Sequence, residues 1–485
     1  MPANVTSAAV VDFIYQPNGT HQREDNAIFD LIFSGETGID LGGGPIAYAF
    51  GGQVRQSNFD SKPISDLNDR RKNPCPVEGD FSCLSRVGAD IGPFIFLGQS
   101  TPVNLSQNIY AAFAEVNVPI GETFELNGAV RYEDYGGSVG STINPKGSFR
   151  FTPTDWLTLR GSAGTTFRGP QASQVSPDSV TSLAGIQASA NNFKSVDIFG
   201  NPTDLGPEKA FTYNLGVVVK TSGFTASVDF WSYDFKDRIT TTPAQAIASS
   251  VANNSTNGTT PVNCASPLAT LITFAGNVCT QGVTVGNDIA RIRTDWVNGP
   301  KVKTQGLDFA IDYTIDVADA ARLSVGAQAS YITKYDVADF IFRGVNLQRG
   351  YTARGFTNYF RDPGTVSKLR ASAFANARFD DLNLRAIYKY VEGVTDDRCP
   401  ALPAPCTTTA DGFSTNFGRE VRDYHQLDLA ASYEINVGDH SALLRAGVEN
   451  VFDRDPSAAR LEIGYDPFVG NPYGRLYTFG ITINY

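Results

Sequence analysis

The sequence contains very little histidine, methionine or tryptophan: three, one and three residues among 485. His21, His425 and His440 lie far apart, and no C-x₂-C pair occurs, so a zinc-type metal site is not expected. The net charge of −11 argues against a nucleic-acid partner. No sequence motif indicates an organic cofactor. We therefore expect no metal, no cofactor and no nucleic acid.

Long hydrophobic runs are also absent. No apolar segment approaches the roughly 20 residues of a membrane-spanning helix. This absence excludes a helical membrane protein but not a membrane barrel, whose strands are short and only half apolar. The start, Met1-Pro2-Ala3-Asn4, has neither the basic residues nor the apolar core of a signal peptide. The simplest interpretation is a cytoplasmic protein; we favour the alternative that the chain begins inside a longer reading frame.

What the sequence does contain is alternation. In the last eleven residues, Tyr477, Phe479, Ile481, Ile483 and Tyr485 are separated by small or polar residues. A β-strand sends successive side chains to opposite faces, so this strand has one apolar face and one polar face. The five apolar side chains are expected to point outward from a barrel.

The same alternation recurs along the chain and predicts fifteen strands. Their ranges are 26–36, 45–55, 105–118, 123–135, 141–151, 156–168, 207–219, 224–238, 304–315, 322–336, 365–379, 382–394, 424–436, 441–451 and 474–485. Short turns and long loops alternate between them, and the tight link 136–140 is the one exception. The segment 289–297 is a candidate extension of the hairpin that precedes it. We otherwise interpret 169–206 and 239–301 as loops.

Sorting of the connections by length favours an all-β, antiparallel transmembrane barrel over a sandwich. Outer-membrane barrels have short turns at one end and long loops at the other, whereas a sandwich has no reason to sort them. The polar faces of the strands carry charges of both signs, which fits a wet lumen. These residues are Arg131, Lys146, Arg150, Arg160, Asp308, Asp312, Arg385, Lys389, Asp428, Arg445 and Glu449.

An odd number of strands has a consequence for closure. If the last strand runs towards the periplasm, so does the first of fifteen, whereas a single-chain barrel has an even count. We therefore expect residues 1–485 to form a partial barrel domain, with residues 1–25 in an extracellular loop. Strands 26–36 and 474–485 should be the two edges of an open, curved sheet. The competing outcome is a forced parallel closure between them.

Six cysteines occur as three local pairs: Cys75 with Cys83, Cys264 with Cys279 and Cys399 with Cys406. All lie in predicted loops. Six cysteines allow 15 connectivities, but the clustering favours pairing between neighbours. Disulfides would place these loops in an oxidising compartment; the alternative is six free thiols.

Several motifs together resemble the TonB-dependent outer-membrane receptors of Gram-negative bacteria. Ile143-Asn144-Pro145-Lys146 with Thr166-Phe167-Arg168 resembles the mid-barrel signature, and Val448 to Asp453 with Tyr473 to Tyr485 resembles the closing signature. The resemblance implies a 22-stranded barrel, of which about fifteen strands are present. The family's N-terminal plug and TonB box have no counterpart here.

The resemblance also implies a function and partners. We expect a receptor for energised uptake of a scarce nutrient, of the siderophore, cobalamin or oligosaccharide class, and no enzyme activity. Its surroundings would be outer-membrane lipid, and the barrel-assembly machinery would recognise the terminal Tyr485. A TonB-type energy transducer would act only through the missing plug. The alternative hypothesis is a passive porin or adhesin, which an even strand count and a closed seam would favour.

Candidate ligand-binding residues come from two loops and one strand end. The loop aromatics are Phe340, Phe342, Tyr351, Phe356, Tyr359, Tyr465 and Phe468. Exposed aromatics among polar residues mark recognition surfaces, although packing between loops explains them equally well. Arg168 is a further candidate, and a lumenal ion pair is its more economical explanation. Gly136 to Gly140 matches the spacing of a nucleophile elbow but lies in a hairpin, so we do not assign it catalysis.

Overall fold

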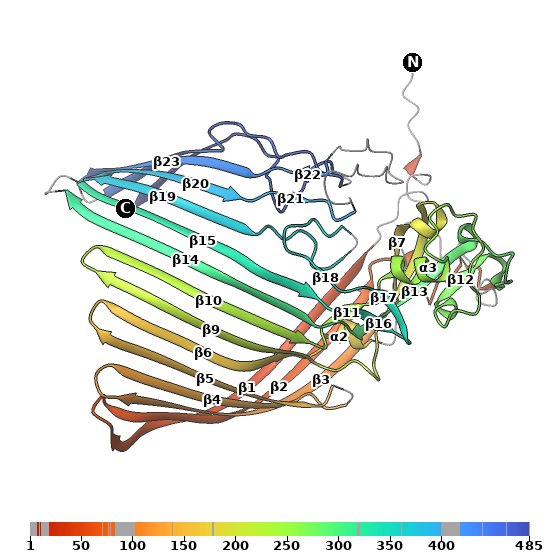
Figure 1. Ribbon diagram of the computed structural model, residues 1–485, viewed down its shortest axis with the longest axis horizontal. Helices are drawn as coiled ribbons and strands as arrows, with labels where there is room; N and C mark the ends of the chain where they lie inside the picture. Colours follow the sequence, from red (N-terminus) through yellow and green to blue (C-terminus); the bar gives the residue numbers. More distant parts are fainter. Residues whose placement is uncertain are drawn as a thin grey trace.

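A computed structural model shows one large, curved antiparallel sheet with a smaller lobe at one end (Figure 1). It describes residues 7, 8, 10, 19–82, 102–398 and 418–484, apart from 70, 76, 78, 138, 177, 178, 318–320, 360, 439 and 462. None of the helices in this described part is long and apolar enough to cross a membrane.

Fifteen strands form one continuous path through the large sheet, and the short strand β18 (Tyr351–Thr352) pairs beside them with β15. In chain order they are β1 (Thr20–Asp40), β2 (Pro45–Pro63), β3 (Val103–Ile120), β4 (Phe124–Asp134), β5 (Ser141–Thr154), β6 (Leu157–Arg168), β9 (Glu208–Thr221), β10 (Phe224–Lys236), β14 (Val302–Val317), β15 (Ala321–Val337), β19 (Leu369–Phe379), β20 (Leu382–Val391), β23 (Tyr424–Val437), β24 (His440–Glu449) and β25 (Leu476–Asn484).

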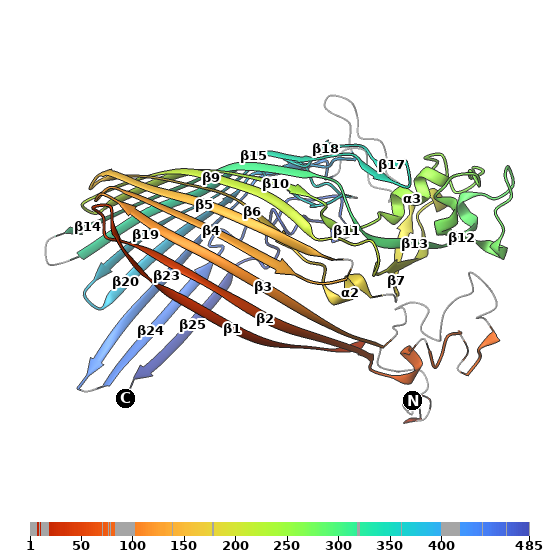
Figure 2. The ribbon, with the colours of Figure 1, turned by 90° about the horizontal axis from the view of Figure 1, so that it is seen from below.

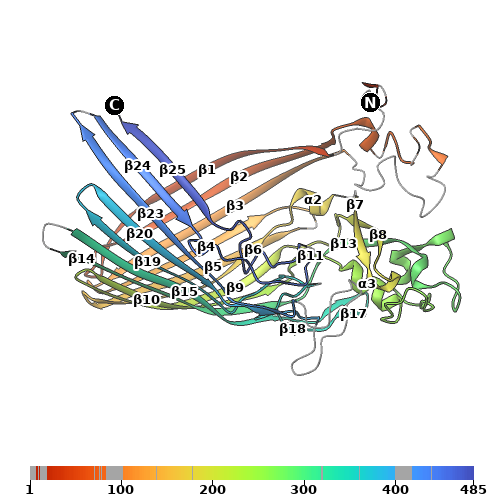
Figure 3. The same ribbon diagram turned by 90° about the horizontal axis from the view of Figure 1, so that it is seen from above.

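Each of the fifteen predicted strands corresponds to one strand of this path, and neighbours along the path pair antiparallel. The path begins at β1 and ends at β25, and no pairing joins these two strands within the described residues. The sheet therefore curls into an open trough (Figure 3). The expectation of an open sheet with these two edges is confirmed. β1 begins at Thr20, so residues 20–25 belong to a strand; the extracellular placement of the residues before it stays a prediction.

The connections are sorted by length as predicted. Short turns lie at one end of the sheet and the long connections and the lobe at the other (Figure 1). Hairpins such as β9–β10 need only the turn around Gly223, whose φ of 73° is the left-handed conformation that glycine adopts easily. The exception is again the tight link between β4 and β5. Both edge strands run towards the short turns, because fourteen antiparallel pairings separate them.

The two faces of the sheet differ as the alternation predicts. The inner face carries ion pairs between strands: Arg160 to Asp229 at 2.8 Å and Lys389 to Asp428 at 2.8 Å. On the outer face of β25, Tyr477, Phe479, Ile481 and Ile483 are 49–82% exposed. Tyr477 is opposite Val448, and Val448 is opposite Leu429, so these side chains share the face away from the inner Asp428. Their predicted outward direction is confirmed, and the side chain of Tyr485 lies outside the described residues. An apolar outer face and a charged inner face are what a barrel in lipid requires.

The sequence interpretation of 169–206 and 239–301 as loops is wrong. These two connections fold together into a lobe with its own sheet, in the order β11 (Ile239–Thr241), β13 (Ile289–Asn298), β8 (Asn192–Phe199) and β7 (Ser179–Ile186). β12 (Ile272–Phe274) also pairs with β13. The helices α2 (Ala172–Val175) and α3 (Ala244–Val251) complete the lobe (Figure 2). Segment 289–297 extends the hairpin only at its end, where Trp296 and Val297 pair antiparallel with β11, just beyond β10. Its earlier part, Arg291 to Asp295, pairs in parallel with β8 instead.

A hydrophobic core holds the lobe together. Ile247, Val251, Ile289 and Ile292 are fully buried in it, and Leu347 from a third connection packs against them. Burial of each such side chain contributes about 1.5–3 kcal/mol. The disulfide Cys264–Cys279 lies at the edge of this core and closes a loop of 15 residues. The predicted pairing of these two cysteines is confirmed.

The other two cysteine pairs are only partly visible. Cys75 is disulfide-bonded. Cys83, Cys399 and Cys406 lie outside the described residues, so their pairings stay predictions.

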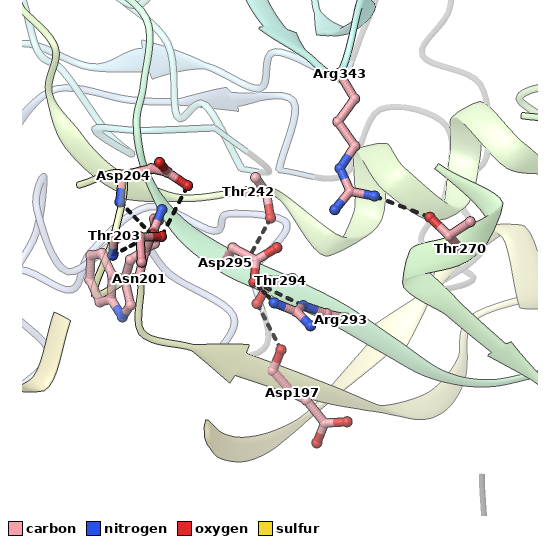
Figure 4. Close-up of polar contacts among 11 residues, drawn as sticks. Asp197, Asn201, Thr203, Asp204, Thr242, Thr270, Arg293, Thr294, Asp295 and Arg343 are labelled. Atoms are coloured by element: carbon pink, nitrogen blue, oxygen red, sulfur yellow. Dashed lines mark hydrogen bonds and ion pairs between the residues drawn. The ribbon is translucent and has the colours of Figure 1, made fainter. Parts of the chain in front are cut away.

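Polar contacts fasten β8 to β13 inside the lobe. The buried Arg291 donates from Nε to Asp197 Oδ2 at 2.9 Å, and Thr181 Oγ1 donates to the other carboxylate oxygen at 2.6 Å. Thr294 Oγ1 donates to the Asp197 carbonyl at 3.2 Å (Figure 4). The backbone N–H of Asp295 donates to Thr242 Oγ1 at 3.0 Å. This bond joins the start of the 239–301 connection to β13.

Two further pairs of short strands lie in the long connections of the sheet. The hairpin of β16 (Phe340–Phe342) and β17 (Val345–Gln348) reaches the lobe core. The pair β21 (Val394–Thr395) and β22 (Glu420–Val421) forms a separate small cluster in which Val394, Val421 and Val469 are buried. The described parts of several long connections are therefore folded and bury side chains of their own.

We predict that the 485-residue chain by itself makes no stable, size-selective pore. Each unpaired backbone group at the edges β1 and β25 would cost several kcal/mol in lipid. Reconstitution into liposomes should give no swelling in sugars of graded size, whereas a complete porin in the same vesicles should give it. Sustained swelling with a sharp size limit would contradict the prediction.

We also predict that Asp197→Asn loosens the lobe. The amide keeps the size of the side chain but leaves the Arg291 guanidinium buried without its counter-charge, which costs about 3 kcal/mol or more. Hydrogen exchange of backbone amides in β8 and β13 should accelerate, while the amides of β14 stay protected. Asp204→Asn, at an exposed position in the same lobe (Figure 4), is the matched control. Equal exchange in the two variants would show that the ion pair does not hold the lobe.

Candidate ligand-binding site

A hollow of about 960 Å³ opens on the inner side of the sheet, at the end that carries the lobe. Its walls come from the outer parts of β1, β2 and β3, the Gly136–Gly137 link and the end of β6, and α2 covers it. The lining residues that carry the argument below are Gln22, Arg55, Gln107, Tyr135, Phe167 and Arg168.

The length of β1 places the hollow at the rim. β1 has 21 residues, whereas a tilted membrane strand needs about 9–11. Its middle part carries the outward Phe29, Leu31 and Phe33, and its first part, 20–26, is polar throughout. The polar part therefore projects beyond the apolar band, and Gln22 on it faces the hollow.

Tyr135 lies at the centre of the polar wall. Its hydroxyl donates to Glu133 Oε2 at 2.9 Å and accepts from Arg55 Nη2 at 3.5 Å. Its ring meets the edge of Phe167, with centroids 5.6 Å apart. Burial, with the neighbouring Glu133 carboxylate, raises the pKa of Tyr135. Tyr135 therefore stays a neutral hydrogen-bonding group between an acidic and a basic side chain.

Arg168 lines the same hollow and is also ion-paired. Its Nη2 lies 3.3 Å from Glu208 Oε2, and its side chain stays 44% exposed. The same Glu208 oxygen accepts the backbone N–H of Ile239 at 3.0 Å, at the root of the lobe. The ion pair expected from the sequence is thus present. The exposed part of the guanidinium remains accessible from the hollow.

The chemistry of the hollow is that of binding. It presents two guanidinium groups, the Glu24 carboxylate, side-chain amides and the rings of Phe59, Tyr135 and Phe167. The guanidinium groups and the rings suit a ligand with anionic and aromatic parts. None of its lining residues is a histidine or a cysteine. Gly136 and Gly137 have φ values of 65° and 55°, which is turn geometry, and Ser138 lies outside the described residues. Among those residues no cluster of His, Cys, Asp and Glu could hold a metal.

Two of the loop aromatics lie in the hairpin of β16 and β17. Phe340 is buried, and Phe342 packs against the lobe core with Arg343 over its ring at 5.4 Å. Arg343 also donates to Thr270 Oγ1 at 3.1 Å (Figure 4). Both aromatic side chains therefore pack between loops in this structure.

Two of the five remaining aromatics lie beneath arginine side chains. Arg361 lies over Tyr351 at 4.7 Å, and Arg398 lies over Tyr359 at 3.9 Å. Tyr351 donates to the carbonyl of Asp362, and burial, together with the nearby Asp362 carboxylate, raises its pKa. This contact group is separate from the hollow described above.

The other three loop aromatics are Phe356, Tyr465 and Phe468. Phe356 forms a single bridge to Thr395, and Tyr465 forms one to Ala458. Phe468 is 59% exposed, and its carbonyl accepts from Arg370 at 2.7 Å. None of the seven loop aromatics lines the hollow, and their role in ligand binding stays a prediction.

Sequence reasoning missed Arg55 and Tyr135 as site residues. Arg55 is visible as a charge on the polar face of its strand, and Tyr135 directly precedes the glycine-rich link. Neither signal shows that the two side chains, 80 residues apart, meet at 3.5 Å.

Comparison with known proteins identifies the family. The family model of the TonB dependent receptor-like β-barrel matches residues 4–451. The iron-regulated outer membrane virulence protein of Vibrio cholerae is 33% identical over 144 residues, which cover 29% of this chain and 20% of that protein.

Solved structures show the same fold. A variant of the ferric enterobactin receptor of Pseudomonas aeruginosa, in complex with enterobactin, matches 96% of this chain with a TM-score of 0.59 and 17% identity. The RagAB peptide transporter matches 95% with a TM-score of 0.57 and 14% identity. In both cases the chain spans 55% of the matched chain's length. The strand path, the sorted connections and the family match over 4–451 lead to one conclusion: this chain belongs to the TonB-dependent receptor family and forms part of its β-barrel.

Proposed function

We propose that the chain is the barrel part of an outer-membrane receptor of a Gram-negative bacterium for energised uptake of a small anionic nutrient complex. The hollow lined by Arg55, Tyr135 and Arg168 is its binding site. The observation that carries this proposal is the pair of guanidinium groups beside two aromatic rings at the outer end of the trough.

Similar proteins support a metal chelate as the ligand. The Vibrio cholerae relative is named as iron-regulated, and the Pseudomonas aeruginosa receptor is named for ferric enterobactin. An iron–catecholate complex is anionic and aromatic, which matches the hollow. Energy would come from a TonB-type transducer that acts through a plug domain in the whole receptor. Lipid would cover the apolar outer face, and the barrel-assembly machinery would recognise the terminal strand through Tyr485.

The open sheet disfavours the passive porin. A porin needs a closed seam, because closure alone removes the unpaired edges of a sheet in lipid. β1 and β25 leave that seam open, and both run in the same direction.

The test is binding of a ferric tris-catecholate complex to the chain in detergent micelles, measured by calorimetry. Arg168→Gln should weaken binding roughly tenfold or more, since a hydrogen bond to a charged group contributes about 1.5–3 kcal/mol. Arg55→Gln should have a similar effect.

Arg150→Gln is the matched control. Arg150 also lies on the inner face and pairs with Glu125 at 2.6 Å, but it does not line the hollow. Its removal should leave affinity within twofold, with folding of every variant checked by circular dichroism. Equal losses in all three variants, or no binding by the unmodified chain, would contradict the proposal.

A further inference from the structure

Three aromatic side chains form a ladder on the inner face of β10. Trp231, Tyr233 and Phe235 alternate along the strand, with ring centroids 5.6 Å and then 6.0 Å apart. Their face is set by Asp229, two residues before Trp231, which forms the inner ion pair with Arg160. Because alternate residues share a face, the ladder rises from this ion pair along the trough wall towards the lobe.

The lowest ring of the ladder lies flat against the wall. A Cβ added to Gly306, the β14 residue opposite Trp231, would meet the indole ring at 2.3 Å. Only a residue without a side chain leaves room for the ring there. Tyr233, one step higher, is 39% exposed. The ladder is therefore a stepped aromatic surface on the wall of the trough.

The residues beside the ladder carry no charge. Across the two neighbouring strands, Trp231 is opposite Asn214 and Gly306, and Tyr233 is opposite Thr212 and Thr304. Phe235 is opposite Ala210 and Val302. The nearest charges on this face are the ion pairs Arg160–Asp229 and Arg168–Glu208, and Asp308, which is opposite Asp229 and accepts from Ser330 Oγ at 2.6 Å. This surface differs from the arginine-bearing hollow and does not favour an anionic ligand.

We propose that the ladder is a binding track for the pyranose rings of a neutral oligosaccharide. The C–H face of a sugar ring is apolar and can stack on an aromatic ring. The hydroxyl groups at its edge can bond to the amide of Asn214 and the hydroxyls of Thr212 and Thr304. A linear chain of rings would extend along the three steps. The site goes beyond the proposed chelate site, because it uses none of the residues of the hollow.

Tryptophan fluorescence tests the proposal directly. The chain has three tryptophans. With Trp156→Phe and Trp296→Phe combined, emission reports on Trp231 alone, in the full chain in detergent micelles. Titration with linear gluco-oligosaccharides of increasing length should give a saturable change. Affinity should rise with each added ring until the three aromatics are occupied and then level off.

Variants separate stacking from general effects on the barrel. By calorimetry, Tyr233→Leu should weaken binding of the longest oligosaccharide roughly three- to tenfold, the effect of one well-placed aromatic contact. Gly306→Ala should do the same by displacing the indole. Phe230→Leu removes a ring from the outer face of the same strand, where Phe230 contacts Tyr213, and should leave affinity unchanged.

The outcomes are distinguishable from those of the chelate experiment. Arg168→Gln should leave oligosaccharide affinity unchanged, and Tyr233→Leu should leave ferric catecholate affinity unchanged. Absence of binding by any oligosaccharide would overturn the proposal and leave packing against another polypeptide segment as the role of the ladder. Equal losses with Tyr233→Leu and Phe230→Leu would overturn it as well.

Discussion

The structure depends on hydrogen bonding between neighbouring strands. An apolar surrounding offers no partner for backbone N–H and C=O groups, so each strand inside the sheet must be paired on both sides. Thirteen of the fifteen strands on the path satisfy this condition, and β1 and β25 satisfy it on one side. The sheet is curved, but no pairing joins its edge strands β1 and β25 within the described residues. Every other feature, from the polar inner face to the raised lobe, is arranged on this open sheet.

The long connections show how polar loops become ordered structures at the rim. Most residues of the lobe core come from the second connection, and Ile186 and Ala188 of the first connection complete it. Together the two connections pair β8 with β13 in parallel and enclose Ile247, Ile289 and Ile292. The ion pair of Arg291 and Asp197 adds a fixed register to this core. The lobe therefore has a core of its own at the end of the sheet that carries the long connections (Figure 1).

Two chemically different surfaces face the trough below the lobe. One combines Arg55 and Arg168 with aromatic rings and suits an anionic complex. The other presents the β10 ladder among uncharged residues. Glu208 connects the first surface to the lobe, since its carboxylate accepts from both Arg168 and the backbone of Ile239. The two surfaces therefore differ in charge, although both lie on the inner face of the same sheet.

The sequence by itself determined the strands, their facing and the open edges. Alternation such as that of Tyr477, Phe479 and Ile481 is local, because the period of a strand is two residues whatever it pairs with. The lengths of the connections are also local, and with the odd strand count they predicted two edges running the same way. The resemblance of motifs near Thr166 and Val448 to the receptor family was confirmed by the family match.

Only the tertiary structure decided the lobe and the sites. β11 and β12 have three residues each, too few to show a period, and the parallel register of Arg291 with Ser195 depends on two connections folding together. Likewise Arg55 reaches Tyr135 across 80 residues, and Trp231 lies flat only because Gly306 stands opposite. Such contacts arise from strand order and register, which local side-chain patterns do not encode.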